Sequence, residues 1–482
     1  MQFLVAIMFL DLLYSYCYQQ TNGASRVLLD NVVVHIDLKN TPLKLSYLTQ
    51  LLPTLRKLGA TGLLMEYEDM FPYEGELVQI QNQNSYRRSE LKNFLIICKY
   101  TNLEVIPLVQ TFGHMEYVLK HREFRELREF DPYMDSICPS KPKSIDLIRK
   151  KLSQVILFHR SVAPLKHIHI GCDEVYYINL LLCKECSVRH LSNEEIFMAH
   201  VQTVTSIVKN MSQDTTVLIW DDMLRFTYSD FPVDQKAEPI VWNYKKKVEV
   251  LHDNLLKYHK TFPNIWIASA YKGADGEESI LPDIKRRFLN HFSWLEVISN
   301  YTFEDDSNVF KFKGIVLTGW SRYASGRKPV DILPCSLPSL VLNLILVDRF
   351  QLDFFPTTDP SVFYSKYLHN RFLNTLRCGV IDVEVNNKYF DVIFDYDNLF
   401  LGHCNFTEWR LYTSLKNYML FYNTVKKTKK INSRMCKEFL EIINGFTFTL
   451  FHIMSKYYAP NFVKEYVTDL ISKIKDLLNG AC

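Results

Sequence analysis

Eight short apolar runs, rich in valine and isoleucine, recur along the first two thirds of the chain, and each ends in a polar or aromatic residue. They occupy residues 32–38, 62–67, 103–109, 167–174, 216–222, 239–244, 265–271 and 314–320. Between most of them lies a stretch with helical apolar spacing, clearest at 43–58, 89–100, 144–159, 194–211 and 282–297. Strands that alternate with helices pair in parallel through crossovers. The sequence therefore predicts a (β/α)8 TIM barrel.

A doubly wound open sheet is the structural alternative, but no glycine-rich phosphate loop follows the first strand. The weak point of the barrel prediction is the short connection from 222 to 239, which holds no convincing helical pattern. After Phe350 the pattern changes to helical segments rich in Phe, Tyr, Leu and Lys. We expect a catalytic barrel over 30–350 and a helical C-terminal domain over 351–482.

The first residues resemble a targeting segment. An apolar run at 3–10 is followed by Asp11, Leu12 and Leu13 and then by a polar stretch to Ser25, so residues 1–25 are read as a signal peptide or an N-terminal extension. Asp11 and the lack of a preceding Lys or Arg weigh against the signal. N-x-S/T sequons begin at Asn210, Asn300 and Asn405. These features favour a glycoprotein of the secretory pathway, extracellular or lysosomal, over the alternative of cytoplasm and nucleus.

Composition adds mainly exclusions. The 482 residues are 48% hydrophobic and carry a formal charge of +3, which indicates a large core and does not indicate nucleic-acid binding. No stable membrane span is expected, and a homodimer is left open. Among eleven cysteines, Cys183 and Cys186 form a single CxxC. A structural zinc site would normally need a second such pair, so a loop disulfide or two free thiols is expected and no metal site.

Barrel enzymes place their chemistry at the carboxyl ends of the strands. Those ends carry acids, amides and aromatic side chains: Asp37, Glu66, Glu68, Gln110, His114, Asp173, Glu174, Trp220, Asp221, Asp222, Trp242, Tyr244, Tyr271, Trp320 and Arg322. Two adjacent acids and several tryptophans at one rim are more typical of a carbohydrate site than of a phosphate or nucleotide site.

The adjacent acids Asp173 and Glu174 follow an apolar run, and neighbouring residues on a strand point in different directions. They cannot then be the facing pair, about 5 Å apart, of an ordinary retaining glycosidase. They suit a reaction in which the substrate supplies its own nucleophile. Glu174 would protonate the glycosidic oxygen and later activate water, and Asp173 would orient a 2-acetamido group. Glu174 must then be protonated near neutral pH, which burial and the neighbouring carboxylate would favour.

Several long motifs carry a resemblance to a known family. They are His-Ile-Gly-Cys-Asp-Glu-Val-Tyr at 169–176, Glu-Tyr-Glu-Asp-Met-Phe-Pro-Tyr-Glu-Gly at 66–75, Pro-Leu-Val-Gln-Thr-Phe-Gly-His-Met-Glu at 107–116, Trp-Asp-Asp-Met at 220–223, Ala-Ser-Ala-Tyr-Lys-Gly-Ala at 268–274 and Leu-Thr-Gly-Trp at 317–320. In order and spacing they resemble the hexosaminidase D branch of glycoside hydrolase family 20, over roughly residues 30–350.

The resemblance implies an exo-β-N-acetylhexosaminidase that removes terminal N-acetylhexosamine from glycans or glycoconjugates. It implies retaining, substrate-assisted hydrolysis through an oxazolinium intermediate, without a cofactor. Glu174 would be the acid/base and Asp173 the partner of the acetamido group, with His114 and Asp222 supporting them. An aromatic box around the sugar is implied for Trp220, Trp242 and Trp320, of which we expect at least two to face the ligand.

Further assignments follow from the same resemblance. Tyr244 is the preferred hydroxyl for the acetamido oxygen, with Tyr271 as its competitor. Better-known family members bind sugar hydroxyls through an Arg at the first strand, where this chain has His35-Ile-Asp37-Leu-Lys39. This departure leaves hydroxyl recognition, and with it the choice between GalNAc and GlcNAc, open. Asp37, at the end of that strand, is a candidate substrate ligand. The branch resembles enzymes that favour galactosaminides, and we expect GalNAc to be preferred over GlcNAc. Its members usually lack a signal peptide, which the present N-terminus does not match.

Three other functions compete. The first is a catalytically inactive barrel retained for glycan binding. The second is a metal-dependent hydrolase that uses His167 and His169, although core histidines are the simpler reading of that pair. The third is an ordinary glycosidase, which the adjacent acids disfavour and which would act on sugars without an acetamido group.

Overall fold

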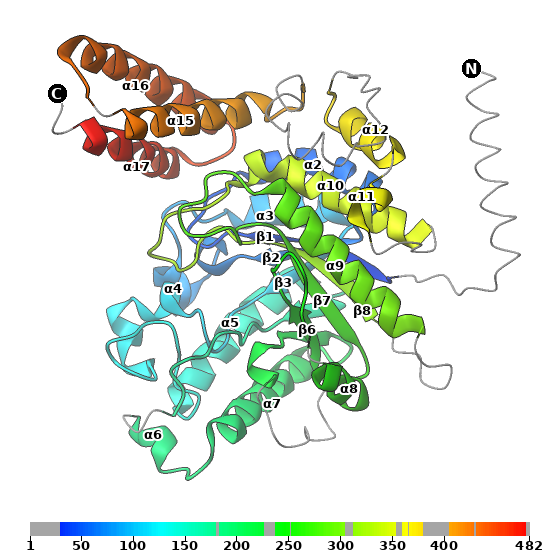
Figure 1. Ribbon diagram of the computed structural model, residues 1–482. Helices are drawn as coiled ribbons and strands as arrows, with labels where there is room; N and C mark the ends of the chain where they lie inside the picture. Colours follow the sequence, from blue (N-terminus) through cyan, green and yellow to red (C-terminus); the bar gives the residue numbers. More distant parts are fainter. Residues whose placement is uncertain are drawn as a thin grey trace, which may run out of the picture.

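The computed structural model describes residues 29–179, 183–225, 237–250, 252–303, 312–352, 359–364, 366–378, 404–428 and 430–478. Eight parallel strands close into a barrel in chain order, with β8 returning to pair with β1 (Figure 1). The strands are β1 (Asn31–Asp37), β2 (Gly62–Glu66), β3 (Glu104–Leu108), β4 (His167–His169), β5 (Thr216–Trp220), β6 (Ala237–Trp242), β7 (Ile265–Lys272) and β8 (Phe312–Gly319). The predicted (β/α)8 barrel is confirmed.

Helices surround the strands, and the five stretches where helical spacing was clearest are all among them. They are α2 (Leu45–Lys57), α3 (Arg88–Tyr100), α5 (Pro142–Arg160), α7 (Asn193–Met211), α8 (His252–Thr261), α9 (Ile284–Phe303) and α10 (Leu333–Leu352), with a short α4 (Glu116–Leu119) and α6 (Lys184–Ser187) inside loops. The start of α7 has a chemical cause, because Ser192 and Glu195 cap each other's backbone N–H groups. The connection after β5, in which the sequence showed no convincing helical pattern, begins with a 3-10 turn at Asp222–Leu224. Residues 226–236 lie outside the described residues.

The fourth strand is shorter than predicted. The sequence indicated an extended run to residue 174, but β4 ends at His169. Gly171, Cys172 and Glu174 have positive φ angles of 71°, 68° and 49°, which an extended strand cannot contain. The acidic pair therefore lies on a loop beyond the strand, and strand alternation does not set the direction of its side chains.

Two apolar layers hold the barrel. One fills its interior and includes Val33, Leu64, Ile106, Trp266 and Val316. The other lies between the strands and the surrounding helices and continues into the C-terminal helices. Among the described residues, the window Leu333–Gln351 on α10 is long and apolar enough to cross a membrane, but 89% of it is buried inside the protein.

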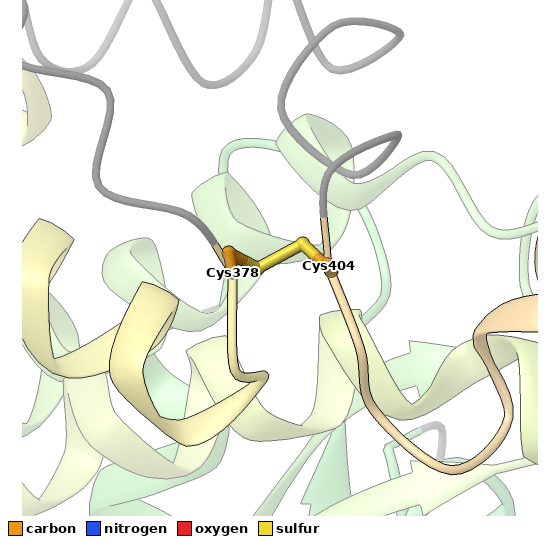
Figure 2. Close-up of a disulfide and its surroundings, with 2 residues drawn as sticks. All are labelled: Cys378 and Cys404. Atoms are coloured by element: carbon orange, nitrogen blue, oxygen red, sulfur yellow. A yellow bond between two sulfur atoms is a disulfide. The ribbon is translucent and has the colours of Figure 1, made fainter.

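The C-terminal part is helical, as predicted. It comprises α11 (Pro360–Phe363), α12 (Lys366–Thr375), α15 (Trp409–Lys427), α16 (Ser433–Met454) and α17 (Pro460–Leu478), with the last three side by side (Figure 1). A disulfide joins Cys378, after α12, to Cys404, before α15 (Figure 2). The predicted signal peptide at 1–25 lies outside the described residues.

The last helix, α17, lies against loops at the carboxyl ends of the strands. Lys328, after β8, is 2.8 Å from Asp469, and Glu278, after β7, is 2.5 Å from Lys473. Arg322 also reaches Glu465 at 3.5 Å. The α17 helix thus packs beside the end of the barrel where the predicted chemistry lies.

Candidate active site

The loops after β3 and β4 approach closely because two glycines allow it. A side-chain carbon on Gly113 would collide with the carbonyl oxygen of Asp173. One on Gly171 would collide with the amide side chain of Gln110, and its positive φ is also unfavourable for other residues. Larger residues would push the loops apart. Since one loop carries His114 and the other carries the acidic pair, this contact sets the geometry of the site.

His114 bridges the two acids. Its Nε2 atom lies 3.3 Å from Asp173 Oδ2 and 3.4 Å from Glu174 Oε2. The Asp173 side chain is buried, with 8% exposed, whereas 37% of the Glu174 side chain is exposed. The other oxygen of Asp173, Oδ1, is buried and has no hydrogen-bond partner among the described residues. The two acids turn toward one imidazole rather than to opposite sides, and only one of them meets solvent.

The charges in this cluster are coupled. Burial is the largest single influence on His114 and disfavours its charged form, but the charge of Asp173 and the hydrogen bonds to Asp173 and Glu174 together raise the pKa of His114 well above its usual range. The hydrogen bond from His114 lowers the pKa of Glu174, although partial burial acts in the other direction. The expectation that Glu174 is protonated near neutral pH is therefore wrong for the free protein. A cationic His114 holds it ionised.

Asp222 connects the acidic pair to the aromatic side of the rim. Its Oδ2 accepts the backbone N–H of Glu174 at 2.8 Å, and its Oδ1 accepts the indole N–H of Trp242 at 3.1 Å. Burial raises the pKa of Asp222 to about 7, and the negative charge of Asp173 adds to the shift. A support for the acidic pair was expected from Asp222, and the structure brings these residues together.

The aromatic side is built from Trp242, Tyr244 and Trp320. The rings of Trp242 and Tyr244 stack with their centroids 5.1 Å apart, and Trp320 Nε1 donates to the Tyr244 hydroxyl at 3.1 Å. The guanidinium of Arg225 lies 4.8 Å from the Trp242 ring and is held by two hydrogen bonds to Asp221. All three aromatic side chains are half-buried, so two of the three predicted tryptophans reach the rim.

Two predicted aromatic contacts are corrected. Trp220, the last residue of β5, is 1% exposed inside the barrel, with its ring 4.5 Å from that of His169. Tyr271 is fully buried, and its hydroxyl donates to the carbonyl oxygen of His35 at 3.1 Å. Trp220 points inward from its strand with a buried indole N–H that has no partner among the described residues, and Tyr271 is already hydrogen-bonded. Both side chains are buried, so neither is exposed at the rim. Of the two candidate tyrosines, Tyr244 is the more accessible one.

Asp37 is also corrected as a substrate ligand. Its Oδ1 accepts the backbone N–H of Lys39 at 2.8 Å, and its Oδ2 accepts that of Ser321 at 2.7 Å. The residue is 3% exposed. Both carboxylate oxygens are occupied, so Asp37 fastens β1 to the loop after β8 instead of facing a sugar.

Comparison with known proteins identifies relatives of this chain. Residues 42–259 match the catalytic domain of glycosyl hydrolase family 20. The chain is 40% identical to hexosaminidase D of Homo sapiens over 67% of its own length and 66% of that protein, just under two thirds. It is 39% identical to hexosaminidase D of Bos taurus over 65% of its own length and 90% of that protein. The chain belongs to glycoside hydrolase family 20. The resemblance inferred from the motifs is confirmed.

Solved structures extend the family 20 assignment to the fold. An N-acetyl-beta-hexosaminidase from Streptomyces plicatus matches with a TM-score of 0.50 and 12% identity, covering 73% of this chain and 69% of that one. A beta-N-acetylhexosaminidase from Bacteroides fragilis matches with a TM-score of 0.52 and 14% identity, covering 75% of both chains. At these identities the likeness shows a shared barrel and nothing finer.

The histidine pair on β4 has other partners in this family 20 barrel. His167 Nδ1 lies 2.8 Å from Glu104 Oε1, and His169 Nδ1 accepts the backbone N–H of Gly171 at 2.9 Å. Burial lowers the pKa of His169 to about 3. The reading of the two as core histidines agrees with these contacts, which give no support to a metal-dependent hydrolase built on the pair.

One positioning residue of the family 20 site was missed from the sequence. Arg225 contacts the Trp242 ring and pairs with the buried Asp221, which also accepts the backbone N–H of Trp242. The i,i+4 spacing of Asp221 and Arg225 is a signal for an ion pair, but it lies in a segment without helical periodicity. Only the fold shows that this pair supports an aromatic ring at the rim.

Proposed function

We propose that the protein is an exo-β-N-acetylhexosaminidase that works by retaining, substrate-assisted hydrolysis. The observation that carries the proposal is the buried Oδ1 of Asp173, without a partner among the described residues, beside the exposed carboxyl of Glu174. A buried acceptor without a donor is costly, and the N–H of a 2-acetamido group would satisfy it. Membership of family 20 and two mammalian relatives named hexosaminidase D support the same activity.

The first step cleaves the glycosidic bond. The acetamido oxygen attacks C1 while Glu174 donates its proton to the departing oxygen. Asp173 accepts the hydrogen bond from the acetamido N–H, and its negative charge stabilises the positive charge that spreads over the forming oxazolinium ring. In the second step Glu174, now ionised, takes a proton from a water molecule that attacks C1 and reopens the ring. Two inversions at C1 give net retention.

Glu174 has to gain a proton before the first step. Because His114 lowers its pKa in the free protein, the active protonation state is a minor one near neutral pH. A bound sugar would displace water from the Glu174 carboxyl, and desolvation raises the pKa of an acid. We therefore expect the activity to be highest under acidic conditions and to decline as the pH rises.

Tyr244 is the proposed donor to the acetamido oxygen. Its hydroxyl oxygen accepts the indole N–H of Trp320 at 3.1 Å. The hydroxyl also has a hydrogen-bond contact with the Thr318 side chain, and its single proton would be directed to the acetamido oxygen when the sugar binds. The stacked ring of Trp242 would lie against one face of the same sugar.

The test is an assay on paired aryl glycosides of GalNAc, GlcNAc and plain galactose, with and without a thiazoline mimic of the cyclised intermediate. The proposal predicts hydrolysis of the N-acetylated substrates alone, blocked by the mimic. Turnover of the plain galactoside would mean ordinary glycosidase chemistry. Tight binding of the mimic without any turnover would mean an inactive glycan-binding barrel.

We also propose that GalNAc is preferred over GlcNAc. The support is the resemblance to a branch that is similar to enzymes favouring galactosaminides. The two sugars differ only in the orientation of the 4-hydroxyl, so the ratio of kcat/KM for the two aryl glycosides is the direct readout. A ratio of one or below would overturn the preference.

A place in the secretory pathway is a separate proposal. Asn210, Asn300 and Asn405 are all exposed, and Cys378 and Cys404 form a disulfide, which persists in oxidising compartments. Expression of the full chain in animal cells, followed by enzymatic removal of N-glycans, should lower its apparent mass. An unchanged mass and a cytosolic or nuclear distribution would favour the alternative.

A further inference from the structure

Three cysteines and one glutamate from two separate loops meet inside the protein. Within the described ranges, Glu129, Cys138, Cys183 and Cys186 each place a potential ligand atom within 4.8 Å of the others, and all four are buried. Cys138 Sγ lies 3.4 Å from Cys183 Sγ and 3.7 Å from Cys186 Sγ. Glu129 Oε2 lies 3.3 Å from Cys186 Sγ. The cluster shares no residue with the acidic pair or with its aromatic neighbours.

The spacing of the sulfur atoms fits a metal site and not a disulfide. All three cysteines are free thiols, and a disulfide would need the sulfurs to be about 2.0 Å apart. Zinc–sulfur bonds of about 2.3 Å in a tetrahedron separate the sulfurs by about 3.8 Å. The observed sulfur–sulfur separations of 3.4 and 3.7 Å are close to that distance.

The surroundings of the cluster also suit a cation. Glu129 is 4% exposed, and a buried carboxylate among thiols requires a compensating charge. Its Oε1 accepts the backbone N–H of Asn179 at 2.8 Å, which leaves Oε2 directed at the sulfurs. The Ser140 hydroxyl lies 3.2 Å from Cys186 Sγ. Such outer contacts orient metal ligands in proteins.

We propose that Glu129, Cys138, Cys183 and Cys186 form a structural Zn²⁺ site. Thiolates select zinc over magnesium or calcium. Four protein ligands leave no open position for substrate or water, which is the pattern of a structural site. The expected absence of a metal rested on the lack of a second CxxC. Here the second pair of ligands is Glu129 and Cys138, on either side of the isolated bridge between Arg128 and Ile137.

The position of the site gives it a role. Glu129 and Cys138 lie on the loop from β3 to α5, which also carries His114. Cys183 and Cys186 lie on the loop from β4 to α7, which also carries the acidic pair. One zinc ion would tie together the two loops whose contact sets the distances from His114 to the acids.

The test begins with metal analysis of the full chain purified without chelators. We expect about one zinc per chain, and less than about a tenth of that in C183S/C186S. Glu129→Gln should weaken zinc binding by about tenfold or more, because it removes the charged ligand. Cys98→Ala is the matched control: Cys98 is a buried free thiol on α3, outside the cluster, and this variant should keep its zinc.

A second measurement uses the wild-type chain alone, so it does not depend on the variants folding. After removal of the metal under reducing conditions, cobalt should bind with the thiolate-to-metal absorption of a tetrahedral site, and zinc should displace it. Removal of the metal should also lower the melting temperature. No uptake of zinc or cobalt, a different resident metal, or a disulfide among Cys138, Cys183 and Cys186 in peptide mapping would each overturn the proposal.

Discussion

The two sides of the barrel rim are built in different ways. The side formed by the loops after β3, β4 and β5 is charged: His114, Asp173, Glu174 and Asp222 contact one another on backbone with positive φ at His114 and Glu174. The side formed after β6 and β8 is aromatic: Trp242 stacks on Tyr244, and Trp320 donates to the Tyr244 hydroxyl. One hydrogen bond, from the Trp242 indole to Asp222, links the two sides. The difference indicates separate roles: the charged side transfers protons, and the aromatic side binds the sugar.

The largest expected effect is on the charged side. Glu174→Gln keeps the shape of the side chain but removes its proton chemistry, so kcat on aryl N-acetylhexosaminides should fall by about 10²–10⁴-fold. Glu76→Gln, on an exposed glutamate paired with Lys150, should have no effect on kcat. Steady-state kinetics of both variants check this. A Glu174→Gln protein with the wild-type rate would remove the basis of the assignment.

The next effect separates two tyrosines. Tyr244→Phe should lower kcat/KM by about 10–100-fold, because it removes a hydrogen bond of about 1.5–3 kcal/mol that forms as charge develops on the acetamido group. Tyr271→Phe should leave kcat/KM within about twofold but cost about 1 kcal/mol of stability, because its hydroxyl is bonded to β1. Kinetics and urea unfolding of both variants distinguish them. The reverse pattern would place the catalytic hydroxyl on Tyr271.

A smaller effect is expected on binding at the aromatic side. Trp242→Leu should raise KM by about tenfold while kcat changes less, since the loss is mainly of ring contact with the sugar. Tyr100→Leu, on an aromatic residue that is 82% exposed on α3, is the control and should leave KM unchanged. If Trp242→Leu lowered kcat as strongly as Glu174→Gln, the two sides of the rim would not have separate roles.

The smallest effect is a shift in pH dependence. Glu174 must be protonated to act, and His114 lowers its pKa, so activity is lost as the pH rises through that pKa. In His114→Gln the charge is gone, the pKa of Glu174 rises, and the alkaline limb of kcat/KM should move to higher pH. A pH profile of both proteins measures this. A limb that stayed in place or moved to lower pH would mean that another group controls it.

Much of the fold could be predicted, because periodicity is a local property. All eight strands and the five clearest helices lie where apolar spacing puts them. The end of β4 could not be predicted in this way, since Cys172 and Glu174 adopt left-handed backbone that their residue types do not indicate. No local pattern therefore indicated that both acids turn toward His114.

The site was predicted unevenly for the same reason. Motifs identified the residues at the strand ends, but not which of their polar groups are already bonded. Asp37 and Tyr271 look like candidate ligands until the backbone partners of their oxygens are known. The cysteine cluster was hidden by distance along the chain, because Cys138 lies 45 residues from Cys183. The C-x-x-C spacing within one loop shows only Cys183 and Cys186.

The central claim is that the acetamido group of the substrate is the nucleophile, with Asp173 orienting it and Glu174 transferring the proton. The most direct test uses aryl glycosides whose N-acetyl group carries increasing numbers of fluorine atoms. Fluorine weakens the acetamido oxygen as a nucleophile and scarcely changes the leaving group. If the substrate supplies the nucleophile, kcat/KM falls steeply with each added fluorine. A value of kcat/KM that does not depend on fluorination would mean that the acetamido group does not attack C1, and the central claim would fail.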